Sequence, residues 1–260
     1  MLASLIALLL SNASASAARP EARRPGTPKP TIVLVHGAFA DASGWSEVTH
    51  RLQRRGYPVL AAPNPLRGVA ADAAYLRSFL ETVPGPIVLV GHSYGGAVIT
   101  NAATGDPDVK ALVYIAAYAL EEGETLAEAN DLGGGRSELL QNIVFRPFGP
   151  GPGDVDGYID PAAFRSLFAQ DLPARDAAVL ATAQRPAALA ALTTPSGPPA
   201  WKSIPSWYLV ARQDRTIPPQ AERVMAARAH AHTVEVDSSH LALMSQPQAV
   251  VSLIRDAAGE

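Results

Sequence analysis

The chain of 260 residues contains no cysteine. This absence excludes disulfide bonds, thiol nucleophiles and metal sites built from thiolate ligands. It does not fix the cellular compartment, because a secreted protein can do without disulfides.

Charge is scarce as well. Charged residues make up 17% of the chain, the formal net charge is −3, and no long basic run occurs. Nucleic-acid binding needs a basic stripe or patch, so the composition gives no support for a nucleic-acid partner. Hydrophobic residues account for 48% of the chain, which allows a sizeable core and does not indicate disorder.

A stable membrane span is not expected either. The segment Leu2 to Leu10 is apolar apart from Ser4, but it is too short to cross a bilayer as a helix. Small residues follow and offer cleavage sites after Ala15 and after Ala17. This order predicts a signal peptide over residues 1–17 and a secreted or periplasmic protein. No Lys or Arg precedes the apolar run, so the alternative is a misassigned start codon and a cytoplasmic protein.

Six short runs of branched and aromatic residues predict strands that are buried on both faces. They cover residues 31–35, 57–62, 87–90, 111–117, 206–211 and 233–236. Helical spacing of apolar residues follows at 44–55, 71–83, 94–104, 219–229 and 248–257. This alternation predicts an α/β fold, with a parallel sheet of about six strands and helices on both faces.

The alternation stops after the fourth strand. Residues 120–204 hold short helical stretches split by glycine- and proline-rich segments, which predicts a helical insertion. We therefore expect a signal peptide (1–17), a Pro- and Arg-rich linker (18–29), the first part of the core (30–119), the insertion (120–204) and the second part of the core (205–258).

The third strand leads directly into Gly-His-Ser-Tyr-Gly, residues 91–95, and a helical pattern follows. This is the Gly-x-Ser-x-Gly nucleophile elbow in its expected strand–turn–helix setting. Ser93 needs a strained backbone so that its hydroxyl projects, and Gly91 and Gly95 leave room where strand and helix approach. The motif predicts a nucleophilic Ser93; an ordinary serine in a glycine-rich turn is the alternative.

A serine nucleophile needs a general base, and the base needs an acid that orients it. Sites in open α/β sheets lie beyond the carboxyl ends of the strands. Asp214 follows the strand that ends at Ala211, and His240 follows the strand that ends at Val236. The order Ser93, Asp214, His240 is a known triad order on this kind of sheet, so we predict that these residues are catalytic.

Other candidates for acid and base are weaker. Asp237, three residues before His240, is the alternative acid. We expect His50, His230 and His232 at the surface. His36 and His92 lie beside the motifs and are expected to line the pocket, together with Gly37 and Phe39.

Two backbone N–H groups should stabilise the oxyanion. The N–H of Tyr94 lies at the N-terminus of the elbow helix, where negative charge is stabilised. The second donor should come from the loop after the first strand, where Gly37 lets the backbone approach closely. We assign it to the N–H of Ala38, with that of Phe39 as the alternative.

These motifs resemble the α/β-hydrolase superfamily. The segments that carry the resemblance are His36-Gly37-Ala38, Gly91 to Gly96, Asp214 before Ile217-Pro218, and Ser239 to Pro247. They are most similar to the branch of plant-type methylesterases, hydroxynitrile lyases and bacterial esterases, including pyrethroid hydrolases. The resemblance spans about residues 30–257 but is weak across the insertion, which corresponds to the family's cap over the pocket. Pro30 leaves no room for the two N-terminal strands of many members, so six strands are expected.

The resemblance implies a carboxylic ester hydrolase that forms an acyl-enzyme at Ser93 and needs no metal or organic cofactor. The expected partner is a small-molecule ester, and the oligomeric state cannot be read from the sequence. Dehalogenases and epoxide hydrolases of this fold carry Asp at the elbow, which Ser93 argues against. Hydroxynitrile lyases of the branch carry Thr in place of Gly37 and Lys in place of Leu241. Cofactor-free haloperoxidases or perhydrolases, and a ligand-binding receptor with little turnover, remain alternatives.

Apolar residues of the insertion are expected either to pack on the core or to line an enclosed pocket above Ser93. They are Leu126, Leu139, Leu140, Ile143, Phe145, Phe148, Phe164, Leu167 and Phe168. An enclosed pocket favours small or medium esters over long-chain triglycerides.

Overall fold

The computed structural model describes residues 28–151 and 153–260. The predicted signal peptide and residues 18–27 of the predicted linker lie outside the described residues. No helix in the described part of the chain is long and apolar enough to cross a membrane.

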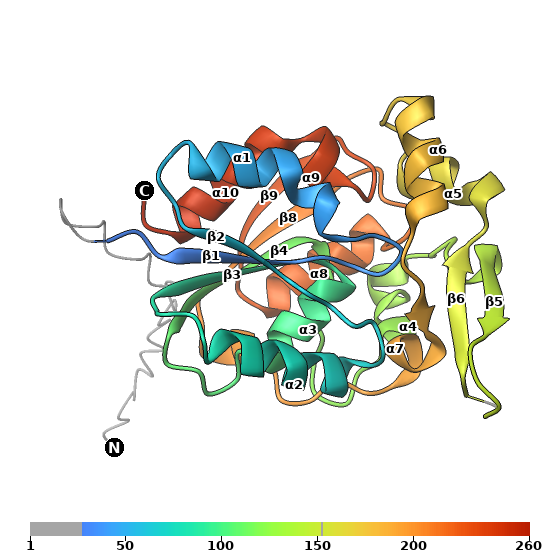
Figure 1. Cartoon of the computed structure of the whole chain (residues 1–260), viewed down its shortest axis with the longest axis horizontal. Coiled ribbons are helices and arrows are strands. Elements are labelled where there is room, and N and C mark those ends of the chain that lie inside the picture. The colour runs from blue at the N-terminus through green and yellow to red at the C-terminus, as the bar shows by residue number, and fades with distance from the viewer. Residues whose placement is uncertain (1–27, 152) are drawn as a thin grey trace, which may run out of the picture.

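The centre of the molecule is a sheet of six parallel strands in the order β2-β1-β3-β4-β8-β9 (Figure 1). The strands are β1 (Thr31–Val35), β2 (Val59–Ala62), β3 (Ile87–Ser93), β4 (Val109–Ala117), β8 (Ser206–Ala211) and β9 (His232–Val236). Every residue of β3 is buried, because the strand lies between β1 and β4 and is covered on both faces. The predicted α/β fold with six strands is confirmed.

Helices cover both faces of this sheet. Those of the core are η1 (Ala42–Trp45), α1 (Ser46–Gln53), α2 (Val69–Leu80), α3 (Tyr94–Ala102), α8 (Pro219–Arg228), α9 (Ala242–Ser245) and α10 (Pro247–Ala257). Helices α1, α9 and α10 lie on one face, and α2, α3 and α8 lie on the other (Figure 1). The sequence did not predict α9, because four residues are too few to show a helical period.

The insertion lies at the end of the sheet toward which the parallel strands point, at the right of Figure 1. Its elements are α4 (Leu126–Ala129), η2 (Leu132–Gly134), η3 (Leu140–Asn142), β5 (Ile143–Pro147), β6 (Val155–Ile159), α5 (Pro161–Phe168), α6 (Ala174–Ala183), β7 (Ala187–Ala188), α7 (Leu189–Thr193) and η4 (Ala200–Lys202). The prediction of a helical insertion is therefore incomplete. Strands β5, β6 and β7 form an antiparallel sheet, and the glycines and prolines between β5 and β6 connect two strands rather than two helices.

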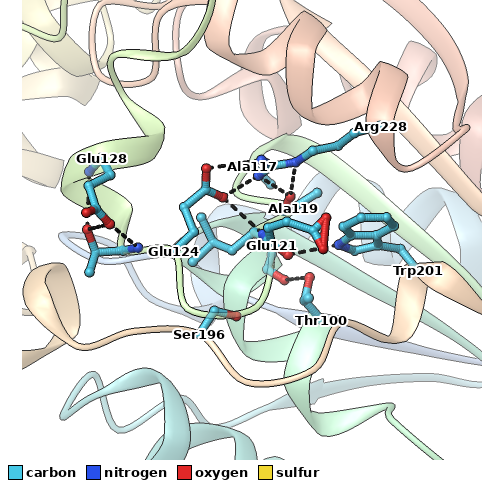
Figure 2. Close-up of polar contacts among 12 residues, drawn as sticks. Thr100, Ala117, Ala119, Glu121, Glu124, Glu128, Ser196, Trp201 and Arg228 are labelled. Carbon is cyan, nitrogen blue, oxygen red and sulfur yellow. Dashed lines mark hydrogen bonds and ion pairs between the residues drawn. The ribbon is translucent and has the colours of Figure 1, made fainter.

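A polar cluster fixes the two ends of the insertion to the core (Figure 2). Arg228 of α8 donates to the carbonyl of Ala119 over 2.7 Å and forms an ion pair with Glu124. The N–H of Gly123 donates to the carbonyl of Ser196, whose own N–H donates back to the carbonyl of Glu124. The start of the insertion, at residues 123–124, is thus hydrogen-bonded to Ser196 near its end, so both connections to the core lie side by side. The largely buried charges of Arg228 and Glu124 are paired there, as charges removed from water need to be.

Candidate active site

Ser93 is the last residue of β3, and α3 begins at the next residue. Its backbone has φ 54° and ψ −124°, in a region that residues with a side chain rarely adopt. A Cβ at Gly91 would lie 2.6 Å from the carbonyl oxygen of Gly95, and a Cβ at Gly95 would lie 2.5 Å from the carbonyl oxygen of Val35. Both positions therefore require glycine, and the turn has the strained geometry that the motif predicts.

His240 and Asp214 form a buried pair. Nδ1 of His240 lies 2.5 Å from Oδ2 of Asp214, and neither side chain is exposed. The other carboxylate oxygen of Asp214 accepts hydrogen bonds from the N–H groups of Thr216 (2.7 Å) and Ile217 (2.9 Å). With Nδ1 paired to this carboxylate, Nε2 is the ring nitrogen of His240 that is left for another partner.

His92, which precedes Ser93, connects the elbow to His240. The two imidazole rings are 4.8 Å apart, and Nε2 of His92 donates to the carbonyl of His240 over 3.0 Å. Burial and the neighbouring His240 lower the pKa of His92 well below its ordinary value, so this ring is neutral. Nε2 of His240 is buried and has no hydrogen-bond partner among the described residues. The residues predicted as nucleophile, base and acid thus meet at the same end of the sheet.

Asp237, the alternative acid, does not contact the imidazole of His240 in the described structure. Its side chain is 68% exposed and pairs with Arg212 over 2.8 Å. The hydrogen bond from Arg212 lowers the pKa of Asp237, as expected for a surface ion pair.

The loop after β1 lies directly against Ser93. A Cβ at Gly37 would be 2.6 Å from Cβ of Ser93 and 3.0 Å from the carbonyl oxygen of His92. The N–H of Phe39 already donates to the carbonyl of Arg185 over 2.9 Å. The N–H of Ala38 has no acceptor among the described residues, and that of Tyr94, the first residue of α3, has none within its helix.

The side chain of Tyr94 holds the start of α3. Its hydroxyl donates to the buried carboxylate of Asp72 over 2.6 Å, and Asp72 also accepts from the N–H groups of Arg67 and Gly68. Burial and the negative charge of Asp72 raise the pKa of Tyr94, so the phenol stays neutral and donates. The sequence showed no sign of this contact, because it joins residues on two different helices.

A small cavity lies beside the elbow, between core and insertion. The core contributes His36, Phe39 and His92, and the insertion contributes Phe164, Phe168 and Leu180. The centre of a water molecule can occupy about 30 Å³ of this space. Three of the four residues predicted to line the pocket border the cavity; Gly37 does not, and packs against Ser93 instead.

Of the other apolar residues predicted to pack or line the pocket, Ile143 is half-buried against the core, as expected, and the remaining six divide into two groups. Leu126, Leu139 and Leu167 are buried, as expected for residues that pack on neighbouring elements. Leu140, Phe145 and Phe148 are each about half exposed, so the expectation that they pack or line the pocket is wrong. They lie on or beside β5, which is an edge strand of the small sheet.

Glu222 of α8 is a fully buried carboxyl group that the sequence analysis missed. One of its oxygens accepts from the N–H of Ala211 over 3.0 Å. Burial and the negative charge of Asp214 raise the pKa of Glu222 well above its ordinary value, so no second negative charge stands beside Asp214 at neutral pH. A glutamate in the first turn of a helix is usually exposed and complements the helix dipole. The sequence alone therefore does not indicate that Glu222 is buried.

No group of three or more histidine or acidic side chains within residues 28–151 and 153–260 is arranged to hold a metal ion. The arrangement at the elbow consists of a serine, an imidazole paired with a carboxyl group, and two backbone N–H groups beside the serine. Residues of these types in this arrangement are typical of enzymes that transfer acyl groups.

Known proteins share this architecture. The chain is 28% identical to Methylesterase 18 of Arabidopsis thaliana, over 87% of this chain and 96% of that protein. It is 26% identical to the Pyrethroid hydrolase of Sphingobium wenxiniae, over 86% of each chain. The crystal structure of polyneuridine aldehyde esterase superposes with a TM-score of 0.75 at 20% identity and covers 88% of this chain and 98% of that one; at this identity the likeness shows the fold.

The resemblance to methylesterases and pyrethroid hydrolases is thus confirmed. The profile described as "Alpha/beta hydrolase family" matches residues 32–253, which include the elbow, Asp214 and His240. The chain belongs to the alpha/beta hydrolase family.

Proposed function

We propose that this protein is a carboxylic ester hydrolase in which Ser93 is the nucleophile, His240 the general base and Asp214 the acid that orients the base. The observation that carries the proposal is the strained elbow at Ser93 beside a buried His240–Asp214 pair. Esterases among the relatives fit the same reaction. An acetate ester of a chromogenic phenol tests it, because a receptor of this fold would bind the ester with little turnover.

In the proposed mechanism, Nε2 of His240 accepts the proton of the Ser93 hydroxyl as the oxygen attacks the ester carbonyl. The alcohol leaves with that proton, and water, activated by the same imidazole, then hydrolyses the acyl-enzyme. Among the described residues, Ser93 and His240 are not hydrogen-bonded to each other, and such bonds are commonly longer in unliganded enzymes. The buried Nε2, which has no hydrogen-bond partner among the described residues, is the acceptor that this step needs.

The N–H groups of Ala38 and Tyr94 are the proposed oxyanion donors. Support comes from the N–H of Phe39, the alternative donor, which is already bound to the carbonyl of Arg185, and from the close approach of the loop at Gly37 to Ser93. Donors fixed in advance lower the barrier because they do not reorganise during the reaction.

Gly37→Ala should lower kcat by about 10²-fold, comparable to losing one oxyanion donor. The added methyl group would lie 2.6 Å from Cβ of Ser93, so the loop or the elbow has to move. Gly153→Ala is the matched control, since no described atom lies within 4 Å of a Cβ at that position. Steady-state kinetics of both variants on an acetate ester provide the check. Equal kcat values for Gly37→Ala and Gly153→Ala would contradict the proposal that this loop supplies an oxyanion donor.

Ester turnover should fall with acyl chains longer than about eight carbons, an order-of-magnitude limit from typical pocket volumes. The cavity is narrow, and a larger acyl group requires Phe164, Phe168 and Leu180 to move apart. A series of p-nitrophenyl esters from acetate to palmitate measures this. Turnover that rises with acyl length, and rises again above the solubility limit of the substrate, would indicate a lipase.

A further inference from the structure

One corner of the insertion contacts both loops that carry the proposed acid and base. This corner, called the α5 corner here, comprises residues 167–171: the end of α5 and the three residues after it. This segment belongs to the part of the chain in which the resemblance to the family is weak, and whose expected role is to cover the pocket.

The α5 corner holds the loop of the base through Asp171. Oδ2 of Asp171 accepts from the N–H of Ser239, the residue before His240, over 2.9 Å. The side chains of Ser239 and Ser245 lie close enough to this carboxylate to lower its pKa further. Partial burial raises the pKa of Asp171, but these contacts together outweigh it and lower the pKa below its ordinary value. The carboxylate is therefore charged at neutral pH and accepts strongly.

The same corner holds the loop of the acid. Nε2 of Gln170 donates to the carbonyl of Gln213, the residue before Asp214, over 2.6 Å. The hydroxyl of Thr216, whose N–H binds Asp214, donates to the carbonyl of Leu167 over 3.4 Å. Two successive loops of the core are thus tied to one short segment of the insertion.

Phe168 connects the corner to the reacting group itself. Its ring is fully buried, lies 4.7 Å from the imidazole of His240 and borders the cavity. The imidazole is thus held from three sides: by Asp214 at Nδ1, by the His92 ring and by the Phe168 ring.

We propose that the α5 corner is part of the machinery that positions the His240–Asp214 pair, and that Asp171 is a positioning residue for the general base. The role assigned to the pair rests on the function proposed above. A cover that only closes the pocket would need no hydrogen bonds to these two loops, whereas a displacement of about 1 Å at the base is enough to slow catalysis strongly.

The test compares Asp171→Ala with Asp171→Asn and Asp160→Ala. Asp160 is the matched control, because its carboxylate accepts from a backbone N–H over 2.9 Å in the same insertion but caps α5 and contacts neither loop. Asp171→Ala should lower kcat for p-nitrophenyl acetate about tenfold with KM changed less than about twofold, since the base and not the pocket is disturbed. Asp171→Asn keeps an acceptor oxygen and should restore kcat to within about threefold of wild type, while Asp160→Ala should keep wild-type kcat even if its melting temperature falls.

Amide hydrogen exchange and a second variant of the α5 corner test the same inference independently of Asp171→Ala kinetics. Amide hydrogen exchange of the segment around residues 239–241 should speed up in Asp171→Ala and stay unchanged in Asp160→Ala. Gln170→Ala, which breaks the link to Gln213, should lower kcat in the same way. Wild-type kcat in Asp171→Ala, or unchanged exchange in that segment, would overturn the inference. An inactive wild-type protein would instead count against the proposed function, and the exchange experiment would still decide whether Asp171 holds the loop.

Discussion

Ser93→Ala should reduce ester hydrolysis by at least about 10³-fold and leave the fold intact. The substitution removes only the hydroxyl oxygen, and alanine keeps the Cβ that already occupies the positive-φ position. The residual rate would come from the oxyanion donors and from substrate binding, which act without the nucleophile. The value of kcat/KM on an acetate ester and the thermal unfolding midpoint are the two quantities to measure.

The control for this prediction is Ser78→Ala on the exposed side of α2, where the hydroxyl donates only to a carbonyl of its own helix. It should keep wild-type activity. A correctly folded Ser93→Ala protein with near-normal turnover would remove Ser93 from the role of nucleophile.

Asp214→Asn should lower kcat by about 10³- to 10⁴-fold. The amide oxygen can still accept from Thr216 and Ile217, so the loop should keep its shape. The amide nitrogen, however, presents N–H groups to Nδ1 of His240, which favours the tautomer with the proton on Nε2. In that tautomer the imidazole has no lone pair with which to accept the proton of Ser93.

Asp237→Asn is the control for Asp214→Asn, because both are aspartates after strands of the same sheet edge. Asp237 pairs with Arg212 at the surface, an exposed ion pair that contributes little to stability, so its loss should change activity less than about twofold. A large loss in Asp237→Asn together with a small loss in Asp214→Asn would reverse the assignment of the acid.

The sheet and the ends of its strands could be predicted because the signals are local. Buried parallel strands are continuous apolar runs, and the loops after them end at the same edge of the sheet. The same signals predict Ser93, Asp214 and His240 as catalytic residues without knowledge of any contact between them. Asp237 also follows a strand, and the structure separates it from Asp214 because Asp214 contacts Nδ1 of His240 whereas Asp237 is exposed and pairs with Arg212.

The remaining features depend on contacts between distant parts of the chain. Asp171 and Ser239 are 68 residues apart in the sequence, and Tyr94 and Asp72 are 22 residues apart. No motif or residue spacing in the sequence indicates either contact. The small sheet of the insertion was missed for a different reason. Glycine and proline mark an interruption between elements but do not tell a helix boundary from a hairpin.

The most direct measurement is covalent labelling of the wild-type protein with a serine-reactive fluorophosphonate, followed by mass spectrometry of its peptides. Attack by an activated serine displaces fluoride and leaves a stable phosphonyl ester on the attacking oxygen. We expect one adduct per chain, located on Ser93, with loss of ester hydrolysis in proportion to labelling and much slower labelling of Asp214→Asn. Full ester hydrolysis by a protein that remains unlabelled, or an adduct on a residue other than Ser93, would contradict the proposed mechanism.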